Sequence, residues 1–340
     1  MRQALVQKRR VRPARTAITG LAVALAVAGC GLIPNAASRY PSKPVQLIVP
    51  FAPGGGQDLS GRLIAAYATK KWGQPVNVVN TTGASGLTGL LQVMNAAPDG
   101  YTMLVDGNVT SSLLAASRSD LPVDIDNRSY LGRISIDPLY YMAFSGSPYQ
   151  TLKDALDAAR SEPGTFTWGA GAFGSSPMFG QLKLFQAAGV PIEQTKMVVF
   201  EQGNAPSLQA LAGGNVLFGI GTSADVATFQ PTGKVRVLGT SASERTKEHP
   251  DVPTAAEQGY SGAEFLLWYS ISGPPRLPDT IAQAWEKLLS EGANDPALLD
   301  EAARATRIIS YISGPDVRKY VEDEYQAFLP LARTAGIRRD

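Results

Sequence analysis

Short apolar runs along the chain alternate with glycine-rich loops and with stretches of helical period. Residues 45–49 (VQLIV) are nearly all apolar, which is typical of a strand that is buried on both faces of a sheet. After a loop, residues 58–71 place Leu59, Leu63 and Tyr67 on one face at helical spacing. The pattern therefore predicts a strand, a loop and a helix in that order.

The same order recurs along the chain and predicts an α/β fold with a mainly parallel sheet. Further strands are predicted at 76–79, 101–105, 165–168, 196–200 and 235–239. Helices are predicted at 58–71 with Asp58 as N-cap, at 86–96, from Pro177, from Pro206, and at 279–291, 296–305 and 314–334.

The N-terminus has the pattern of a segment that directs export. Six basic residues and no acidic residue precede an apolar run of about 13 residues, which is too short to span a bilayer. Small residues then precede Cys30, the chain's only cysteine, so we predict a lipoprotein signal peptide at 1–29 with acylation of Cys30. A plain signal peptide with an incidental cysteine and a twin-arginine signal at Arg9-Arg10 are the alternatives.

Removal of the basic leader changes the charge of the chain. The whole chain carries +2, and because the leader carries +6, the remainder carries −4. A nucleic-acid partner is therefore not expected, since phosphate binding needs a basic surface. With a single histidine and a single cysteine, neither a histidine-based triad nor a metal site is expected, and no motif calls for a cofactor.

Three loops, at residues 53–57, 169–176 and 202–205, form the candidate ligand site. Each leaves a strand and enters a helix, where unpaired N–H groups and the helix dipole favour an anion. Ligands of open α/β sheets bind at this end of the strands. Each loop alone could be a tight turn that only caps a helix. The spacing excludes a dinucleotide fingerprint, since position 59 is leucine, and no P-loop lysine follows.

Read together, the loops resemble the periplasmic solute receptors of tripartite tricarboxylate transporters, the Bug family. The resemblance runs from Tyr40 to about Phe328. It rests on residues 40–44 (YPSKP), 48–58 (IVPFAPGGGQD), 73–76 (GQPV), 97–102 (APDGYT), 233–238 (GKVRVL) and 250–254 (PDVPT).

This resemblance implies a two-lobed, type II-like Venus-flytrap fold, with a tether at 30–39, one lobe at 40–141 plus 264–340 and the other at 142–263. It also implies a small carboxylate ligand, a separate membrane permease as partner, and a location in the periplasm or at the cell surface. The candidate ligand-binding residues are Phe51, Pro53, Gly54, Gly55, Gly56, Gln57, Asp58, Asn108, Gly171, Ala172, Phe173, Gly174, Ser175, Ser176, Gly203, Asn204, Thr222 and Ser223.

The chain departs from the family pattern at two basic positions. Residues 80–84 (NTTGA) replace an Asn-Arg-Pro-Gly-Ala stretch, and residues 197–202 (MVVFEQ) replace His-Val-Pro-Tyr-Lys-Gly, which puts Glu201 where a lysine is usual. The loss of positive charge favours a monocarboxylate, an amino acid or an aromatic acid over a tricarboxylate. An exported enzyme acting on a small acid, or a receptor for a membrane sensor kinase, remains an alternative.

Overall fold

The computed structural model describes residues 40–122, 124, 127–162, 164–201 and 203–338. The predicted signal peptide at 1–29, Cys30 and the tether at 30–39 lie outside the described residues. All the strands and helices below belong to the unit Pro41–Asp340.

A six-stranded sheet has the order β11-β4-β10-β3-β1-β2. Its β1 pairs in parallel with β2 and β3. By contrast, β10 runs antiparallel to β3 and β4, and β11 runs antiparallel to β4. The strands are β1 (Val45–Val49), β2 (Val76–Asn80), β3 (Thr102–Gly107), β4 (Ser129–Pro138), β10 (Leu266–Gly273) and β11 (Ile308–Ser313).

A five-stranded sheet has the order β7-β6-β8-β5-β9. Here β6 pairs in parallel with β7 and β8, while β5 runs antiparallel to β8 and β9. The strands are β5 (Tyr140–Phe144), β6 (Thr167–Ala170), β7 (Lys196–Val199), β8 (Phe218–Gly221) and β9 (Val235–Thr240).

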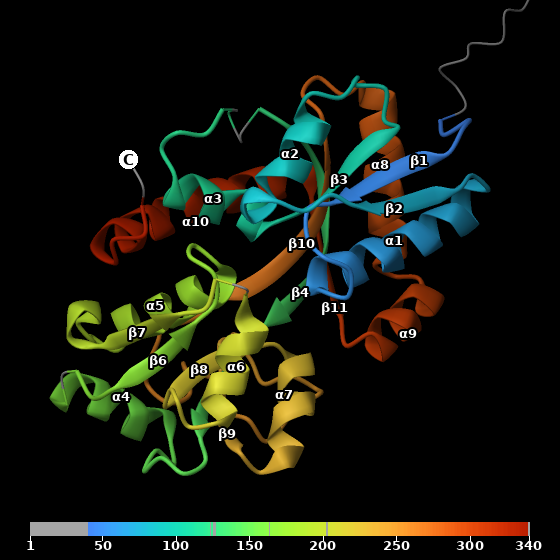
Figure 1. Cartoon of the computed structure of the whole chain (residues 1–340). Helices are drawn as coiled ribbons and strands as arrows, with labels where there is room; N and C mark the ends of the chain where they lie inside the picture. The colour runs from blue at the N-terminus through green and yellow to red at the C-terminus, as the bar shows by residue number, and fades with distance from the viewer. Residues whose placement is uncertain (1–39, 123, 125–126, 163, 202, 339–340) are drawn as a thin grey trace, which may run out of the picture. The chain divides into compact units, whose positions relative to one another are not determined.

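The chain passes from the first sheet to the second between β4 and β5 and returns between β9 and β10 (Figure 1). Only Leu139 separates β4 from β5. The prediction of a mainly parallel sheet is wrong, because the strands next to these crossings run against their neighbours and make both sheets mixed. The predicted lobe limits of 40–141 plus 264–340 and 142–263 stay a prediction.

The helices follow the strands and cover the sheets (Figure 1). They are α1 (Gly56–Trp72), α2 (Leu87–Met94), α3 (Ser112–Ser117), α4 (Leu152–Ser161), α5 (Ser176–Ala187), α6 (Asn204–Ala212), α7 (Ser223–Phe229), α8 (Asp279–Gly292), α9 (Pro296–Arg304) and α10 (Gly314–Thr334), with short 3-10 turns η2 (Ala84–Gly86), η3 (Asn108–Thr110), η4 (Ile192–Gln194) and η5 (Gln230–Thr232). Within the described ranges, no helix combines the length and the apolar character that crossing a membrane requires.

Aromatic side chains dominate the largest core cluster. Trp168, Phe179 and Phe218 are fully buried in it. Phe328 of α10 packs against Phe179 of α5, with ring centroids 5.3 Å apart. The C-terminal helix thus contributes to the core beneath the second sheet, which anchors α5 and its N-terminus.

Candidate functional site

The loop after β1 brings backbone close to the start of α1. Gly54 has a φ of 87°, a left-handed conformation that glycine adopts readily. Gly56, the first residue of α1, lies against Tyr269, and a Cβ at this position would be 2.2 Å from the tyrosine Oη. Position 56 therefore has no room for a side chain, and the start of α1 offers unpaired N–H groups.

The Asp58 side chain holds the loop after β1 in place through hydrogen bonds. Its buried carboxylate accepts hydrogen bonds from the Gly54 N–H (2.9 Å), Arg62 Nε (2.8 Å) and Asn80 Nδ2 (2.9 Å). Burial alone would raise the pKa of Asp58, but these donors together lower it. The prediction of Asp58 as N-cap is wrong, because α1 starts before it. Asn80 Nδ2 also donates to the Phe51 carbonyl at 2.9 Å.

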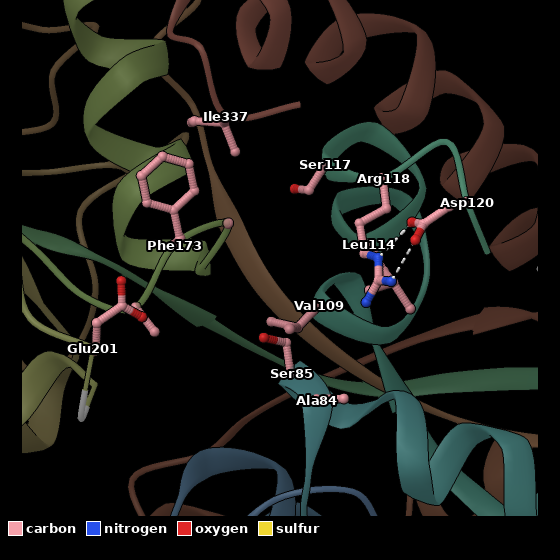
Figure 2. A pocket seen from close by; sticks show the side chains of 12 residues that line it. Ala84, Ser85, Val109, Leu114, Ser117, Arg118, Asp120, Phe173, Glu201 and Ile337 are labelled. Carbon is pink, nitrogen blue, oxygen red and sulfur yellow. Dashed lines mark hydrogen bonds and ion pairs between the residues drawn. The ribbon is translucent and has the colours of Figure 1, made fainter. Parts of the chain in front are cut away.

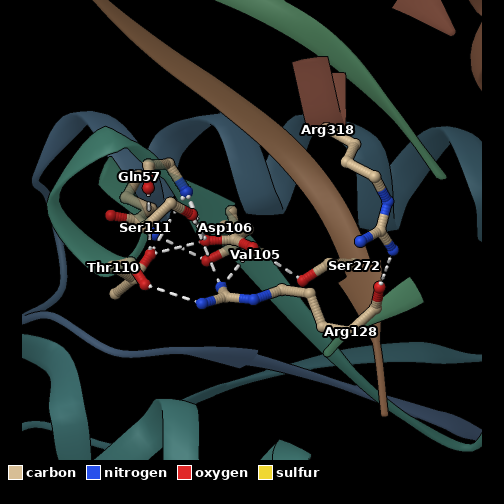
Figure 3. Close-up of polar contacts among 9 residues, drawn as sticks. Gln57, Val105, Asp106, Thr110, Ser111, Arg128, Ser272 and Arg318 are labelled. Carbon is tan, nitrogen blue, oxygen red and sulfur yellow. Dashed lines mark hydrogen bonds and ion pairs between the residues drawn. The ribbon is translucent and has the colours of Figure 1, made fainter. Parts of the chain in front are cut away.

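A buried ion pair shapes the turn after β3 (Figure 3). Arg128 Nη1 lies 2.7 Å from Asp106 Oδ2, and both side chains are fully buried. Burial raises the pKa of Asp106, but Arg128 and the surrounding donors outweigh that effect and lower it. Three hydroxyl groups also donate to the carboxylate, at 2.6 to 2.9 Å: those of Thr110, Ser111 and Ser272.

This network fixes η3 and therefore Asn108. Asn108 Nδ2 donates to the Leu266 carbonyl of β10 at 3.1 Å. Its Oδ1 accepts from the Ser176 hydroxyl at 3.2 Å, a buried contact between η3 and α5. The Asn108 amide thus joins elements of both sheets, with both of its polar atoms engaged.

Two buried polar atoms at the starts of α5 and α6 have no hydrogen-bond partner among the described residues. They are Ser175 Oγ and Asn204 Oδ1. Ser175 is the residue before α5, and Asn204 is the first residue of α6. Asn204 Nδ2 donates to the Ile220 carbonyl at 2.9 Å, so the amide is held with its oxygen on the other side. Both residues line the cavity described next.

A cavity of about 470 Å³ lies between these elements. The first wall is made of lining residues that follow strands of the first sheet (Phe51, Gly55, Gly56, Gln57 and Asn108). The second wall is made of those that follow strands of the second sheet (Ala172, Phe173, Gly174, Ser175, Ser176, Glu201, Gly203 and Asn204). Twelve of the predicted residues line this cavity, namely all members of the two walls except Glu201. Six predicted residues do not: Pro53, Gly54, Asp58, Gly171, Thr222 and Ser223.

Thr222 and Ser223 lie instead at the start of α7. The Thr222 hydroxyl accepts from the Asp225 N–H as the N-cap of that helix. Ser223 Oγ lies 2.9 Å from His249 Nε2, and His249 is partly buried against Tyr140, with ring centroids 4.9 Å apart. Thr222 and Ser223 thus make local contacts at the start of α7.

Sequence reasoning did not select six residues that also line the cavity. Glu201 was noted only as a departure from the family pattern. Leu267 and Tyr269 belong to β10, a strand that the pattern did not predict. Ser85 has a φ of 55°, which the sequence does not reveal. The six are Ser85, Val109, Pro177, Glu201, Leu267 and Tyr269.

Tyr269 lines the cavity with an uncharged phenol. Burial raises the pKa of its hydroxyl. Behind it, Arg307 Nη1 lies 2.6 Å from Asp137 Oδ2, and the guanidinium lies 6.0 Å from the Tyr269 ring centroid. Burial raises the pKa of Asp137 to about 6, despite the opposing effect of Arg307. The buried Arg307 is thus already paired with a carboxylate.

A second cavity of about 430 Å³ adjoins the first and shares Glu201 and Phe173 with it. Figure 2 shows Phe173 and Glu201 on one side and Ser85, Val109 and Arg118 on the other. Arg118 donates to both oxygens of Asp120, at 2.9 Å each. The cation of this second cavity is thus neutralised by its neighbour.

The geometry can hold an anion without a basic side chain. The starts of α1, α5 and α6 all line the cavity of 470 Å³. Their unpaired N–H groups and helix dipoles attract negative charge. Among the described lining residues, Glu201 is the only charged one. Main-chain N–H groups and uncharged polar side chains can therefore hold a carboxylate there.

Comparison with known proteins identifies the family. The family profile described as "Tripartite tricarboxylate transporter family receptor" matches residues 61–336. The chain belongs to this family. It is accordingly a solute-binding receptor of the periplasm and not an enzyme. The predicted family and the two-sheet α/β fold of periplasmic binding proteins are confirmed.

Individual relatives agree with this assignment. Protein BugT of Bordetella pertussis is 29% identical over 325 residues, which cover 93% of this chain and 96% of the relative. The structure of MatC from Rhodopseudomonas palustris with bound malate is 26% identical, with a TM-score of 0.73, and covers 86% of this chain and 99% of that one. The periplasmic binding protein BugD has a TM-score of 0.74 at 23% identity, covering 88% of this chain and 100% of BugD, and this match concerns the fold.

Proposed function

We propose that this receptor captures a small organic carboxylate in the cavity between the two walls and delivers it to a tripartite tricarboxylate-type permease in the membrane. The observation that carries the proposal is the meeting of three helix N-termini at one cavity, those of α1, α5 and α6. A carboxylate there accepts hydrogen bonds from main-chain N–H groups, and charge-assisted bonds of this kind are the stronger ones.

Relatives with known ligands support the same class of compound. MatC was solved with malate, and a further R. palustris protein of this fold was solved with adipate. Both ligands are small organic acids. Closure of the two walls around such a molecule would exclude water and strengthen its hydrogen bonds.

The proposal is tested by a thermal-shift screen of organic acids on the protein purified from an exporting host. Neutral sugars and organic cations serve as controls. A ligand at about 1,000 times its Kd stabilises the folded state by about 4 kcal/mol, so a true ligand raises the melting temperature visibly. A shift with only sugars or cations would refute the carboxylate assignment.

We also propose that the mature protein is held at the membrane by acylation of Cys30. The support is the apolar run and the small residues that precede this single cysteine. Radiolabelled palmitate should enter the wild-type protein and not the Cys30→Ser variant, which should move to the soluble fraction. Equal labelling of both proteins would refute the anchor.

A further inference from the structure

A buried arginine lies directly behind the start of α1. A Cβ on Gly56 would lie 2.2 Å from Tyr269 Oη and 3.1 Å from Arg307 Nη1, so the phenol and the guanidinium meet at the first residue of this helix. Gly56 and Tyr269 line the cavity of 470 Å³, whereas Arg307 does not and is only 5% exposed. Arg307 therefore places a positive charge behind two residues of the lining.

The partner of Arg307 is an incompletely paired carboxylate. Arg307 Nη1 donates to Asp137 Oδ2 at 2.6 Å, and its Nε donates to the Ala305 carbonyl at 3.3 Å, so the guanidinium is held from two sides. Asp137 is buried as well, and its Oδ1 has no hydrogen-bond partner among the described residues. Because a buried oxygen without a donor disfavours the charged form, Asp137 takes up a proton more readily than an exposed aspartate does.

Charged and titratable groups from several elements act on the Asp137 carboxylate. Burial raises its pKa to about 6, and two acidic groups add to this effect while Arg307 opposes it. The phenols nearby stay uncharged, since burial raises the pKa of each. The groups are Arg307, Tyr269 of β10, Tyr140 of β5, Asp225 of α7 and Glu248. Above about pH 6 the ionised Asp137 therefore offsets the charge of Arg307, and below it the neutral Asp137 does not.

We infer that Arg307 is a positioning residue for carboxylate capture: from behind Gly56 and Tyr269 it supplies the positive charge that the described cavity lining lacks, and Asp137 sets how much of this charge acts on a bound acid. The inference rests on the proposed function, because it needs a carboxylate bound at the start of α1. Coulomb attraction in a buried site acts over several ångströms, so Arg307 needs no direct contact with the acid. Binding of an acid should therefore favour protonation of Asp137.

The experiment compares the full-length wild-type protein with Asp137→Asn by calorimetry at about pH 5 and about pH 7.5. The probes are malate, adipate and benzoate, together with every acid that raises the melting temperature in the thermal-shift screen. Titration of the acid itself cancels in the ratio of the two proteins' Kd values at one pH. Asp137→Asn should bind about 10-fold tighter than wild type at the higher pH and within about twofold at the lower pH.

A charge-neutral double variant, Asp137→Asn with Arg307→Gln, separates charge from structure. Arg307→Gln alone would leave Asp137 buried without its cation, so both groups are changed together. The double variant should match wild type within about threefold near pH 7.5 and bind about 10-fold more weakly than wild type near pH 5. It also tests the inference independently of how well Asp137→Asn folds, which melting curves of both variants report.

Asp300→Asn is the matched control, since Asp300 is exposed on α9 and lines neither cavity. The same loss of charge should there leave the Kd unchanged. Burial raises the pKa of Glu324 to about 7 and lowers that of His249, so these groups can add a pH dependence of their own. Glu324→Gln and His249→Gln should nevertheless keep most of the wild-type profile.

The outcomes separate this inference from the proposed function. If acids bind but the Kd ratio of Asp137→Asn to wild type is the same at both pH values, the inference is overturned and the proposed function stands. A double variant that binds like wild type at both pH values would overturn it equally. If no acid binds the wild-type protein at either pH, the proposed function fails, and the inference fails with it.

Discussion

The two walls of the cavity differ in how their polar side chains are satisfied. On the first wall, Gln57 Nε2 donates to the Val105 carbonyl at 2.5 Å, and the Asn108 amide is engaged on both sides. On the second wall, Ser175 Oγ and Asn204 Oδ1 are buried without partners among the described residues. The first wall is thus a preformed support, whereas the second wall contains buried side-chain oxygens that no described residue pairs.

This difference separates affinity from selectivity. The starts of α1, α5 and α6 present N–H groups that any carboxylate can use, so both walls contribute to the binding of the whole class. The second wall contributes more side chains to the lining, among them the charged Glu201, so substitutions there bear on which ligand binds. Substitutions on the first side should therefore act mainly on stability, and those on the second side mainly on ligand choice.

The largest effect is expected for Arg128→Met. The change leaves the Asp106 carboxylate buried without its cation, which should lower the free energy of unfolding by about 3–5 kcal/mol in urea titrations. Arg118→Met is the control, since its pair with Asp120 is exposed and contributes at most about 1 kcal/mol. Equal losses in the two variants would contradict the view that the buried pair supports the first wall.

The second-largest effect is expected for Gly56→Ala. The added methyl group would lie 2.2 Å from Tyr269 Oη and should cost about 1–3 kcal/mol of stability in thermal melts. Tyr269→Phe removes the hydroxyl and should recover part of the loss. In Gly55→Ala the nearest atom is the Ala52 carbonyl oxygen at 3.7 Å, so this control should stay within about 0.5 kcal/mol. Similar melting temperatures for the two alanine variants would show that the contact between position 56 and Tyr269 is not tight.

The variant Asp58→Asn tests whether the Asp58 carboxylate stabilises the loop after β1, through the pH dependence of the protein's stability. The pKa of Asp58 is lowered in the folded protein, so its stabilising contribution is full above the unfolded value near 3.8 and is lost as the pH falls through the folded value. At pH 7 the variant should be less stable by about 2 kcal/mol. The gap should close below about pH 4 in melting curves recorded along a pH series. A gap that persists in acid would mean that packing, and not charge, explains the loss.

The smallest effects are expected for two serines, Ser175 and Ser223, which the sequence analysis placed in the same site. Ser175→Ala should weaken binding of the preferred acid about tenfold in calorimetry, equivalent to about 1.4 kcal/mol, and leave the free protein's melting temperature unchanged. Ser223→Ala should lower that temperature, since Ser223 Oγ contacts His249, and leave the affinity unchanged. The reverse pattern would mean that the ligand occupies another cavity.

Local pattern predicted the strand–loop–helix units well. The strand at 45–49 and the helix at 314–334 have the bounds that apolar runs and capping residues indicated. The helices α3, α4 and α7 were not predicted. Neither were the strands β4, β5, β8, β10 and β11. They are placed by pairing between segments far apart in sequence, such as Tyr269 with Gly107, and no local signal encodes such a register.

Contacts between segments far apart in sequence also limited the prediction of the site. Loops that enter helices directly from strands were visible in the sequence, and most of their residues line the cavity. The sequence could not show that Asp58 turns inward to Asn80 and Gly54, since that depends on the packing of β2 beside β1. It also could not place Tyr269, which reaches the site only through the pairing of β10 with β3.

The crowded contact at Gly56 bears on how such a receptor can diverge. Binding of a carboxylate by peptide N–H groups does not depend on the identity of most surrounding side chains. The chain can therefore differ from BugT at most of its aligned positions and still retain a backbone able to hold an acid group. A change of ligand would then need substitutions among the side chains that line the cavity, whereas a Cβ at Gly56 would lie against Tyr269.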